Sequence, residues 1–163
     1  GRLTLNPIKH IDPIGSVVIP GILFLVHSPF LFGWAKPVPV NFRNLKNIRL
    51  GLILVAMAGP LTNIILAYGY ILIYKYGILV GLSQIWQWAI MFNLILCVFN
   101  LIPIPPLDGS RVLMGIMPKQ FNIYYSRLEP FGFIIVLVLL QLNVLNFMTP
   151  VIKLLAALLG IEL

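Results

Sequence analysis

Charged side chains are scarce in this chain, and acidic ones are the scarcest. Only 9% of its 163 residues are charged, just four are Asp or Glu, and 60% are hydrophobic. A soluble domain carries roughly 25% charged residues, so the composition argues against a soluble protein and predicts an integral membrane protein. The length suits one compact domain.

Cysteine and histidine are nearly missing as well. Cys97 is the only cysteine, which excludes a disulfide framework or a cysteine-based metal site within one chain. The two histidines, His10 and His27, cannot form the H-E-x-x-H pair that supplies two zinc ligands on one helix. No serine has a histidine at helical spacing, so the sequence makes no case for a serine nucleophile.

The net charge of +7 could suggest nucleic acid, but the basic residues are scattered between apolar runs instead of forming a stripe. They fit the edges of membrane segments better, so we expect no nucleic-acid partner. Lys and Arg gather in two loops, Lys36–Arg49 and Arg111–Arg127, which two spanning segments separate. Both loops should therefore share one side of the membrane, and the positive-inside rule makes that side cytoplasmic.

Four stretches lack charged side chains: residues 13–35, 50–74, 76–107 and 130–152. A spanning helix needs about 20 predominantly apolar residues, which the second and fourth stretches and residues 83–102 of the third provide. Pro20-Gly21 and Pro29 interrupt the first stretch, which either spans as a broken helix or dips in and returns. We therefore predict an all-α integral membrane protein, a bundle of about three to five transmembrane or re-entrant helices.

Prolines and asparagines predict where these helices bend or end. Gly59-Pro60 should kink the second helix, with Asn63 facing the bundle interior one turn later. In the fourth stretch a helix over about residues 128–142 should turn near Asn143–Asn146, followed by a short helix after Pro150. Alternating prolines favour a short extended or β segment over Lys36–Asn41.

Residues 100–111 place one carboxylate, Asp108, after three prolines at the cytoplasmic end of an uncharged run. Asp108 could cap a helix over residues 109–117 by accepting a backbone hydrogen bond from about Arg111. It could instead bind a cation such as zinc, which accepts carboxylate oxygen. The local pattern leaves both interpretations open. His10 and Asp12 could be a ligand pair, although a polar turn before a membrane segment explains them more simply.

Four segments together resemble the site-2 proteases, which are intramembrane zinc metalloproteases, and in particular their compact prokaryotic branch. In chain order these are residues 1–15, residues 32–41, Ala58-Gly-Pro-Leu-Thr-Asn63 and Asn100-Leu-Ile-Pro-Ile-Pro-Pro-Leu-Asp108-Gly109. They follow the order of the family and cover the chain to about residue 118. The H-E-x-x-H helix of the family precedes the first of them, so we expect this sequence to begin partway into a longer protein.

The resemblance implies a role for each matched residue. Asp108 would be the third zinc ligand, and Asn100 would donate a hydrogen bond to the developing oxyanion. Gly59, Pro60, Asn63 and Gly109 would give structural support. The substrate, an unwound transmembrane helix, would pair with an edge formed by Lys36, Pro37, Val38, Pro39, Val40 and Asn41. Zinc-bound water would then hydrolyse the peptide bond.

The implied protein is a single membrane-embedded protease core over residues 1–163 in a prokaryotic cell membrane, with one Zn²⁺ per complete site. Its partners would be the lipid bilayer and transmembrane substrates, and homo-oligomerisation is left open. Because two zinc ligands and the general base of the family are absent, we expect this chain alone to be inactive. The competing hypotheses are a non-catalytic scaffold of the same fold and a small transporter, although a transporter predicts a repeated half that we do not find.

Overall fold

The computed structural model describes residues 7–27, 33, 35–36, 47–78 and 80–161. The chain divides into two compact units, residues 1–41 and residues 42–163, and each is described here by itself. Every regular element among the described residues is a helix, which confirms the all-α prediction. The single protease core expected for the whole chain stays a prediction.

In the first unit, a 3-10 turn (Pro7–His10) leads into a π-helix (Pro13–Val18) and then into α1 (Ile19–Leu25). Asp12 caps this pair of helices, because its Oδ1 accepts hydrogen bonds from the backbone N–H groups of Ile14 at 3.0 Å and Gly15 at 2.9 Å. The apolar helical run Pro13–Leu25 is shorter than a membrane span. Residues 28–32 and 34 of the first apolar stretch lie outside the described residues, so whether it spans or dips in and returns stays a prediction.

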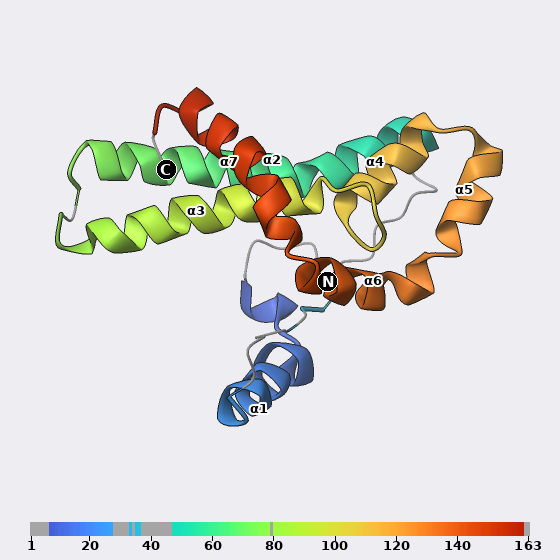
Figure 1. Cartoon of the computed structure of the whole chain (residues 1–163), viewed down its shortest axis with the longest axis horizontal. Helices are drawn as coiled ribbons and strands as arrows, with labels where there is room; N and C mark the ends of the chain where they lie inside the picture. Colours follow the sequence, from blue (N-terminus) through green and yellow to red (C-terminus); the bar gives the residue numbers. More distant parts are fainter. Residues whose placement is uncertain (1–6, 28–32, 34, 37–46, 79, 162–163) are drawn as a thin grey trace. The chain divides into compact units, whose positions relative to one another are not determined.

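The second unit is built on two long helices, α2 (Ile48–Lys75) and α3 (Ser83–Asn100). Both are long and apolar enough to cross a membrane, which confirms the spans predicted for the second and third stretches. Asn47 caps the start of α2, and α2 continues through Pro60 without ending. The two helices run side by side in opposite directions (Figure 1), joined by a turn in which Gly77 has a φ of +65°.

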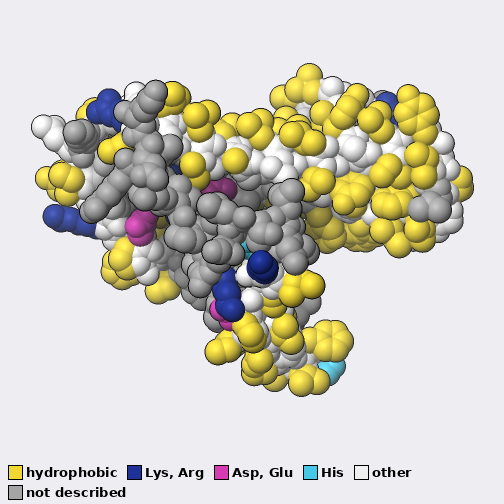
Figure 2. All heavy atoms as spheres, turned by 180° about the vertical axis from the view of Figure 1, so that it is seen from behind, with side chains coloured by type: hydrophobic (Ala, Val, Ile, Leu, Met, Phe, Trp, Pro, Cys, Tyr) yellow, Lys and Arg dark blue, Asp and Glu magenta, His cyan; other side chains and the backbone are white. Residues whose placement is uncertain are grey.

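A third helix, α7 (Val144–Leu158), packs against α3 and closes the core of this unit. The core joins small and branched side chains from all three helices: Ala67, Ile71, Ile90, Leu94, Val98, Met148, Ile152 and Ala156. Small residues let helices approach closely, which matters in a bilayer because lipid tails are as apolar as leucine. The outside of the α2–α3 pair is covered mostly by hydrophobic side chains (Figure 2), as a surface facing lipid would be.

Between α3 and α7 lie α4 (Asp108–Ile116), α5 (Lys119–Ser126), a 3-10 turn (Glu129–Phe131) and α6 (Gly132–Gln141). Residues Gln120–Phe131 and Ile134–Gln141 form a pair bent by 75°, which counts as a third candidate span if the pair is one broken helix. The predicted turn after α6 is confirmed at Asn143, whose φ is +52°.

Two expectations about local structure are not met. The short helix expected after Pro150 is wrong, because α7 already begins at Val144 and runs through Pro150. The proline removes one ladder hydrogen bond, while Met148 and Ile152 on either side of it both pack into the core. No strand occurs among the described residues, Lys36 included, and Pro37–Asn41 lie outside them, so the predicted extended segment is not confirmed.

Candidate functional site around Asp108

The segment that leads to Asp108 is a loop, residues 101–107, that contains three of the chain's prolines. Each of its backbone N–H groups donates a short-range hydrogen bond: Leu101 to Cys97, Ile102 to Phe99, Ile104 to Ile102 and Leu107 to Ile104, at 2.8–3.2 Å. The other three residues are Pro103, Pro105 and Pro106, which have no N–H to satisfy. The unwound loop therefore carries no free backbone donor, which suits a segment at membrane depth.

Asp108 is the first residue of α4 and does not cap it. The N-cap position belongs to Leu107, and no side chain makes a capping hydrogen bond there. The interpretation of Asp108 as a helix cap is therefore wrong, because the helix begins one residue earlier than the sequence suggested. Among the described residues, the half-buried carboxylate of Asp108 has no hydrogen bond and no ion pair.

The carboxylate of Asp108 lies directly over Gly59 of α2. A Cβ atom added to Gly59 would stand 3.0 Å from Asp108 Oδ2, so the missing side chain makes room for the carboxylate. Two segments about 50 residues apart in the sequence thus meet at one point. Gly59 lies roughly 16 Å along α2 from the start of that helix. Asp108 therefore lies beside the interior of α2, whereas the sequence predicted a position at the end of an apolar helix.

Two further glycines set the path of α4. A Cβ on Gly109 would stand 2.2 Å from the carbonyl oxygen of Leu101, and one on Gly115 would stand 2.9 Å from that of Arg49. The start of α4 is therefore pressed against the proline loop, and its end against the first turn of α2. The end of α4 therefore lies beside Arg49, and the side of the membrane on which the basic loops lie stays a prediction.

Helix α5 braces the proline loop from outside. The hydroxyl of Tyr125 donates a hydrogen bond to the carbonyl oxygen of Pro103, and Asn122 Nδ2 donates to that of Met114 at 2.8 Å. The rings of Phe121 and Tyr125 stack at 5.4 Å. The i, i+4 spacing in the sequence predicts the Phe121–Tyr125 pair within α5, but it does not predict the contact with Pro103.

The negative charge of Asp108 is only partly offset by nearby positive charge. Burial raises the pKa of the Asp108 carboxyl above its ordinary value, and the positive charge of Arg111 partly lowers it again. Arg111 lies one turn further along α4 and forms no ion pair with Asp108. The site therefore holds a partly desolvated acid whose oxygens have no partner in the part of the chain that the structure describes and can accept a ligand.

The other residues singled out from the sequence are distributed over both units. Asn100 ends α3 and leads into the proline loop, and its partly buried amide makes no hydrogen bond among the described residues. Asn63 is one turn beyond Gly59, on the same face of α2, and is partly buried, while Pro60 is fully buried. Thus Asp108 lies against Gly59, and the next residue, Gly109, lies against the proline loop. Asn63 lies on the same helix as Gly59, and Asn100 ends α3.

In the first unit, Asp12 uses its carboxylate as a helix cap, which favours the structural explanation for that residue. The carbonyl oxygen of His10 accepts a hydrogen bond from the backbone N–H of Lys36 at 2.9 Å. Main-chain pairing thus connects the opening segment to the start of the predicted substrate edge. The rest of that edge, Pro37, Val38, Pro39, Val40 and Asn41, lies outside the described residues.

Within the part of the chain that the structure describes, no three His, Cys, Asp or Glu side chains gather into a metal-binding group. A catalytic zinc site uses three protein ligands and a water. The described residues therefore do not form a complete zinc site. Asp108 can contribute one oxygen ligand.

Comparison with known proteins gives a consistent result. The profile described as Peptidase family M50 matches residues 69–143, which include α3, the proline loop and Asp108. The chain is 43% identical over 160 residues to "Putative zinc metalloprotease YwhC" of Bacillus subtilis, covering 92% of this chain and 66% of that protein.

Two further relatives carry similar names. "Putative zinc metalloprotease Rip2" of Mycolicibacterium smegmatis is 28% identical over 90% of this chain and 56% of that protein. "Putative zinc metalloprotease MJ0611" of Methanocaldococcus jannaschii is 47% identical over 36% of this chain and 31% of that protein. The chain thus spans about one third to two thirds of the length of these relatives. No solved structure matches it.

Proposed function

The chain belongs to peptidase family M50, the site-2 protease family, and from that membership we propose that it forms the Asp108 part of an intramembrane zinc metalloprotease. The observation that carries the proposal is the carboxylate of Asp108. It lies over Gly59, is partly buried, and has no protein partner among the described residues.

A divalent cation would explain this arrangement. A carboxylate that is withdrawn from water without a partner destabilises the fold, and bound metal restores the lost interactions. Zinc accepts carboxylate oxygen as a ligand, so Asp108 would supply one donor. Zinc bound in the complete protein would act as a Lewis acid and activate a water molecule.

The neighbouring residues would hold and position this ligand. Gly59 leaves the space that Asp108 occupies, and Gly109 lets α4 start directly against the proline loop. Pro60 and Asn63 shape the same stretch of α2. Asn100, whose amide at the end of α3 has no partner among the described residues, would donate a hydrogen bond to the oxyanion of the substrate.

The substrate class follows from the membrane setting. Apolar helices and family membership support an integral membrane protein, so the substrate would be a transmembrane protein segment unwound for cleavage. Lys36–Asn41 would pair with the unwound segment through main-chain hydrogen bonds. With the positive-inside rule, both basic loops, and the mouth of the site with them, would face the cytoplasm.

The test is zinc binding by the protein expressed from its complete reading frame and purified in detergent. Zinc affinity is measured by chelator competition for the wild type, Asp108→Asn and the matched control Glu129→Gln, which alters an exposed carboxylate. Loss of a ligand should weaken binding more than the roughly 10- to 100-fold typical of residues behind the ligands, while Glu129→Gln should bind normally.

Equal zinc affinity in the wild type and Asp108→Asn would overturn the ligand assignment. A second measurement follows cleavage of a transmembrane reporter in reconstituted vesicles. A protein that binds zinc through Asp108 but cleaves no transmembrane reporter would favour the non-catalytic scaffold.

A further inference from the structure

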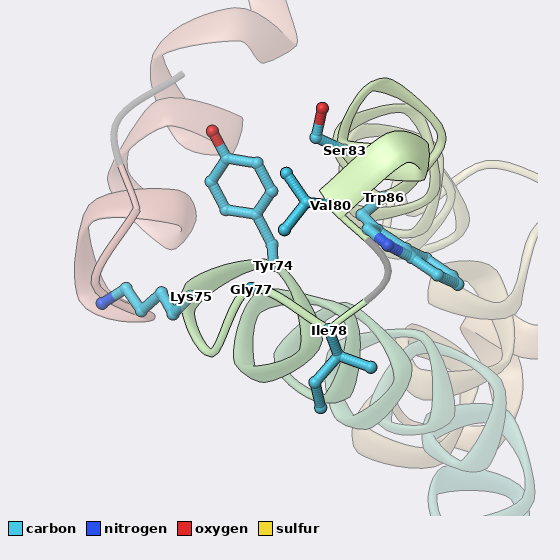
Figure 3. A pocket seen from close by; sticks show the side chains of 7 residues that line it. All are labelled: Tyr74, Lys75, Gly77, Ile78, Val80, Ser83 and Trp86. Atoms are coloured by element: carbon cyan, nitrogen blue, oxygen red, sulfur yellow. The ribbon is translucent and has the colours of Figure 1, made fainter.

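A pocket lies at the end of the α2–α3 pair away from Asp108. It begins at Tyr74, roughly 22 Å along α2 from Gly59, so it is separate from the Asp108 site. Its volume is about 360 Å³, and its walls are the end of α2, the connecting turn and the start of α3. The lining residues are Tyr74, Lys75, Gly77, Ile78, Val80, Ser83 and Trp86 (Figure 3).

The polar groups of this pocket are hydrogen-bond donors. Trp86 Nε1 is buried and has no hydrogen-bond partner in the structure, and an indole nitrogen can only donate. The Tyr74 hydroxyl oxygen accepts a hydrogen bond from Gln87 Nε2 at 3.0 Å, so its own proton is left to donate. The hydroxyls of Tyr74 and Ser83 point to the same side of the pocket (Figure 3).

The buried indole N–H is the observation that points to a ligand. A buried donor without an acceptor destabilises a protein by about 1–3 kcal/mol, so such groups normally have a partner. The Trp86 ring cannot simply turn away, because it stacks on Tyr70 with the ring centroids 6.0 Å apart. An acceptor atom inside the pocket would satisfy it.

The charge of the surroundings selects an anion. Lys75 is the cation at the rim, and its exposed side chain extends away from Trp86 (Figure 3). A Cβ on Gly160 would stand 3.1 Å from Lys75 Nζ, so the ammonium group must swing from the end of α7 to reach a ligand in the pocket. The sequence has no Asp or Glu between Asp12 and Asp108, so no carboxylate on α2, α3 or the turn between them competes for these donors. A cationic group would be repelled by Lys75.

The position of the pocket suggests where the anion comes from. It lies at one end of two spanning helices, where phospholipid phosphates are found, and Tyr70, Tyr74 and Trp86 are typical of the membrane interface. We propose that the Tyr74–Trp86 pocket binds the phosphate of an anionic phospholipid, with Trp86 and Ser83 donating hydrogen bonds and Lys75 supplying the charge.

The protein from the complete reading frame is placed in nanodiscs of phosphatidylcholine with increasing phosphatidylglycerol. The indole N–H resonance of Trp86, identified with Trp86→Phe, should move downfield and saturate as phosphatidylglycerol increases. Trp88 is the internal control, because it is 57% exposed and stacks on Phe92 away from the pocket. A Trp86 signal that does not move with phosphatidylglycerol overturns the proposal.

Variants give an independent measurement. Lys75→Gln should weaken phosphatidylglycerol binding by about tenfold or more, as expected for a charged hydrogen-bond partner, whereas Lys153→Gln on α7 should leave it unchanged. Equal losses of phosphatidylglycerol binding in both variants would indicate only a general charge effect and would overturn the proposal. Inorganic phosphate is added in a separate arm. If phosphate at millimolar concentration also moves the Trp86 signal, the site takes a free phosphate group, and if it does not, the phosphate must be part of a lipid.

Zinc affinity is measured in the same samples and should not change with lipid or with Lys75→Gln. The two proposals can therefore fail separately.

Discussion

Replacing Gly59 tests the contact between α2 and Asp108 directly. A Cβ at this position would stand 3.0 Å from Asp108 Oδ2, which is tighter than ordinary van der Waals contact, so the carboxylate must move by a few tenths of an ångström. Alanine adds this one carbon, and valine adds two more methyl groups in the same place. The series Gly59→Ala and Gly59→Val thus displaces Asp108 by increasing amounts.

The two effects of Gly59→Ala have opposite signs. Alanine in a helix interior is more favourable than glycine by about 0.8–1.0 kcal/mol, so the free energy of unfolding should rise or stay level. A metal ligand must be held within about 0.5 Å of its place, so alanine should weaken zinc binding only modestly. Valine exceeds that tolerance and should weaken zinc binding by about 10- to 100-fold, as other disturbances of ligand position do.

The matched control is Gly69 on the same helix, where a Cβ would meet nothing within 4 Å. Thermal unfolding in detergent and zinc affinity by chelator competition are measured for alanine and valine at both positions. The expected pattern is similar stability at the two positions but a loss of zinc affinity only at Gly59. If Gly59→Val and Gly69→Val bind zinc equally well, Asp108 does not depend on the space over Gly59 and the reasoning fails.

Three other substitutions test separate parts of the structure. Tyr125→Phe keeps the ring but removes the hydrogen bond to Pro103, so the free energy of unfolding should fall by about 1 kcal/mol in denaturant titration, and no change would mean that α5 does not brace the loop. Asp12→Ala removes a helix cap and should destabilise the first unit by about 1 kcal/mol, seen as faster proteolysis, with zinc affinity unchanged; a loss of zinc would restore Asp12 as a ligand candidate. Ile90→Ala should lower the free energy of unfolding, measured by thermal unfolding, by about 2–5 kcal/mol, because Ile90 is fully buried. Ile85→Ala should have little effect, since Ile85 is 55% exposed. Equal losses in the two variants would contradict the packing described for α3.

Composition and the length of apolar runs were enough to predict the membrane class and the two long helices. Both signals depend on local sequence, because a spanning helix satisfies its backbone within its own segment. The turn at Asn143 was also predictable, since asparagine tolerates the left-handed conformation that the structure shows there. Family resemblance, rather than local pattern, was what singled out Asp108 over a simple helix cap.

The remaining features depend on contacts between distant segments. The sequence near Pro150 does not predict that α7 runs through it. The helix hydrogen bond that this proline removes is compensated by the packing of α7 against α3. The space over Gly59 is likewise defined by Asp108, which no reading of residues 56–63 alone would reveal. The contact between Tyr125 and Pro103 joins positions 22 residues apart and has no periodic signal.

The three prolines of the loop before Asp108 matter differently in water and in a bilayer. Replacing any one of them by alanine would add an amide hydrogen to a segment whose other amide hydrogens are all in use. In water that hydrogen would find a solvent molecule, but inside a bilayer it would remain unsolvated at a cost of several kcal/mol. In this loop the main effect of proline is that it has no amide hydrogen that would need a hydrogen-bond partner inside a bilayer. The loop could therefore vary freely in water, whereas at membrane depth its composition is constrained by the need to satisfy every amide hydrogen.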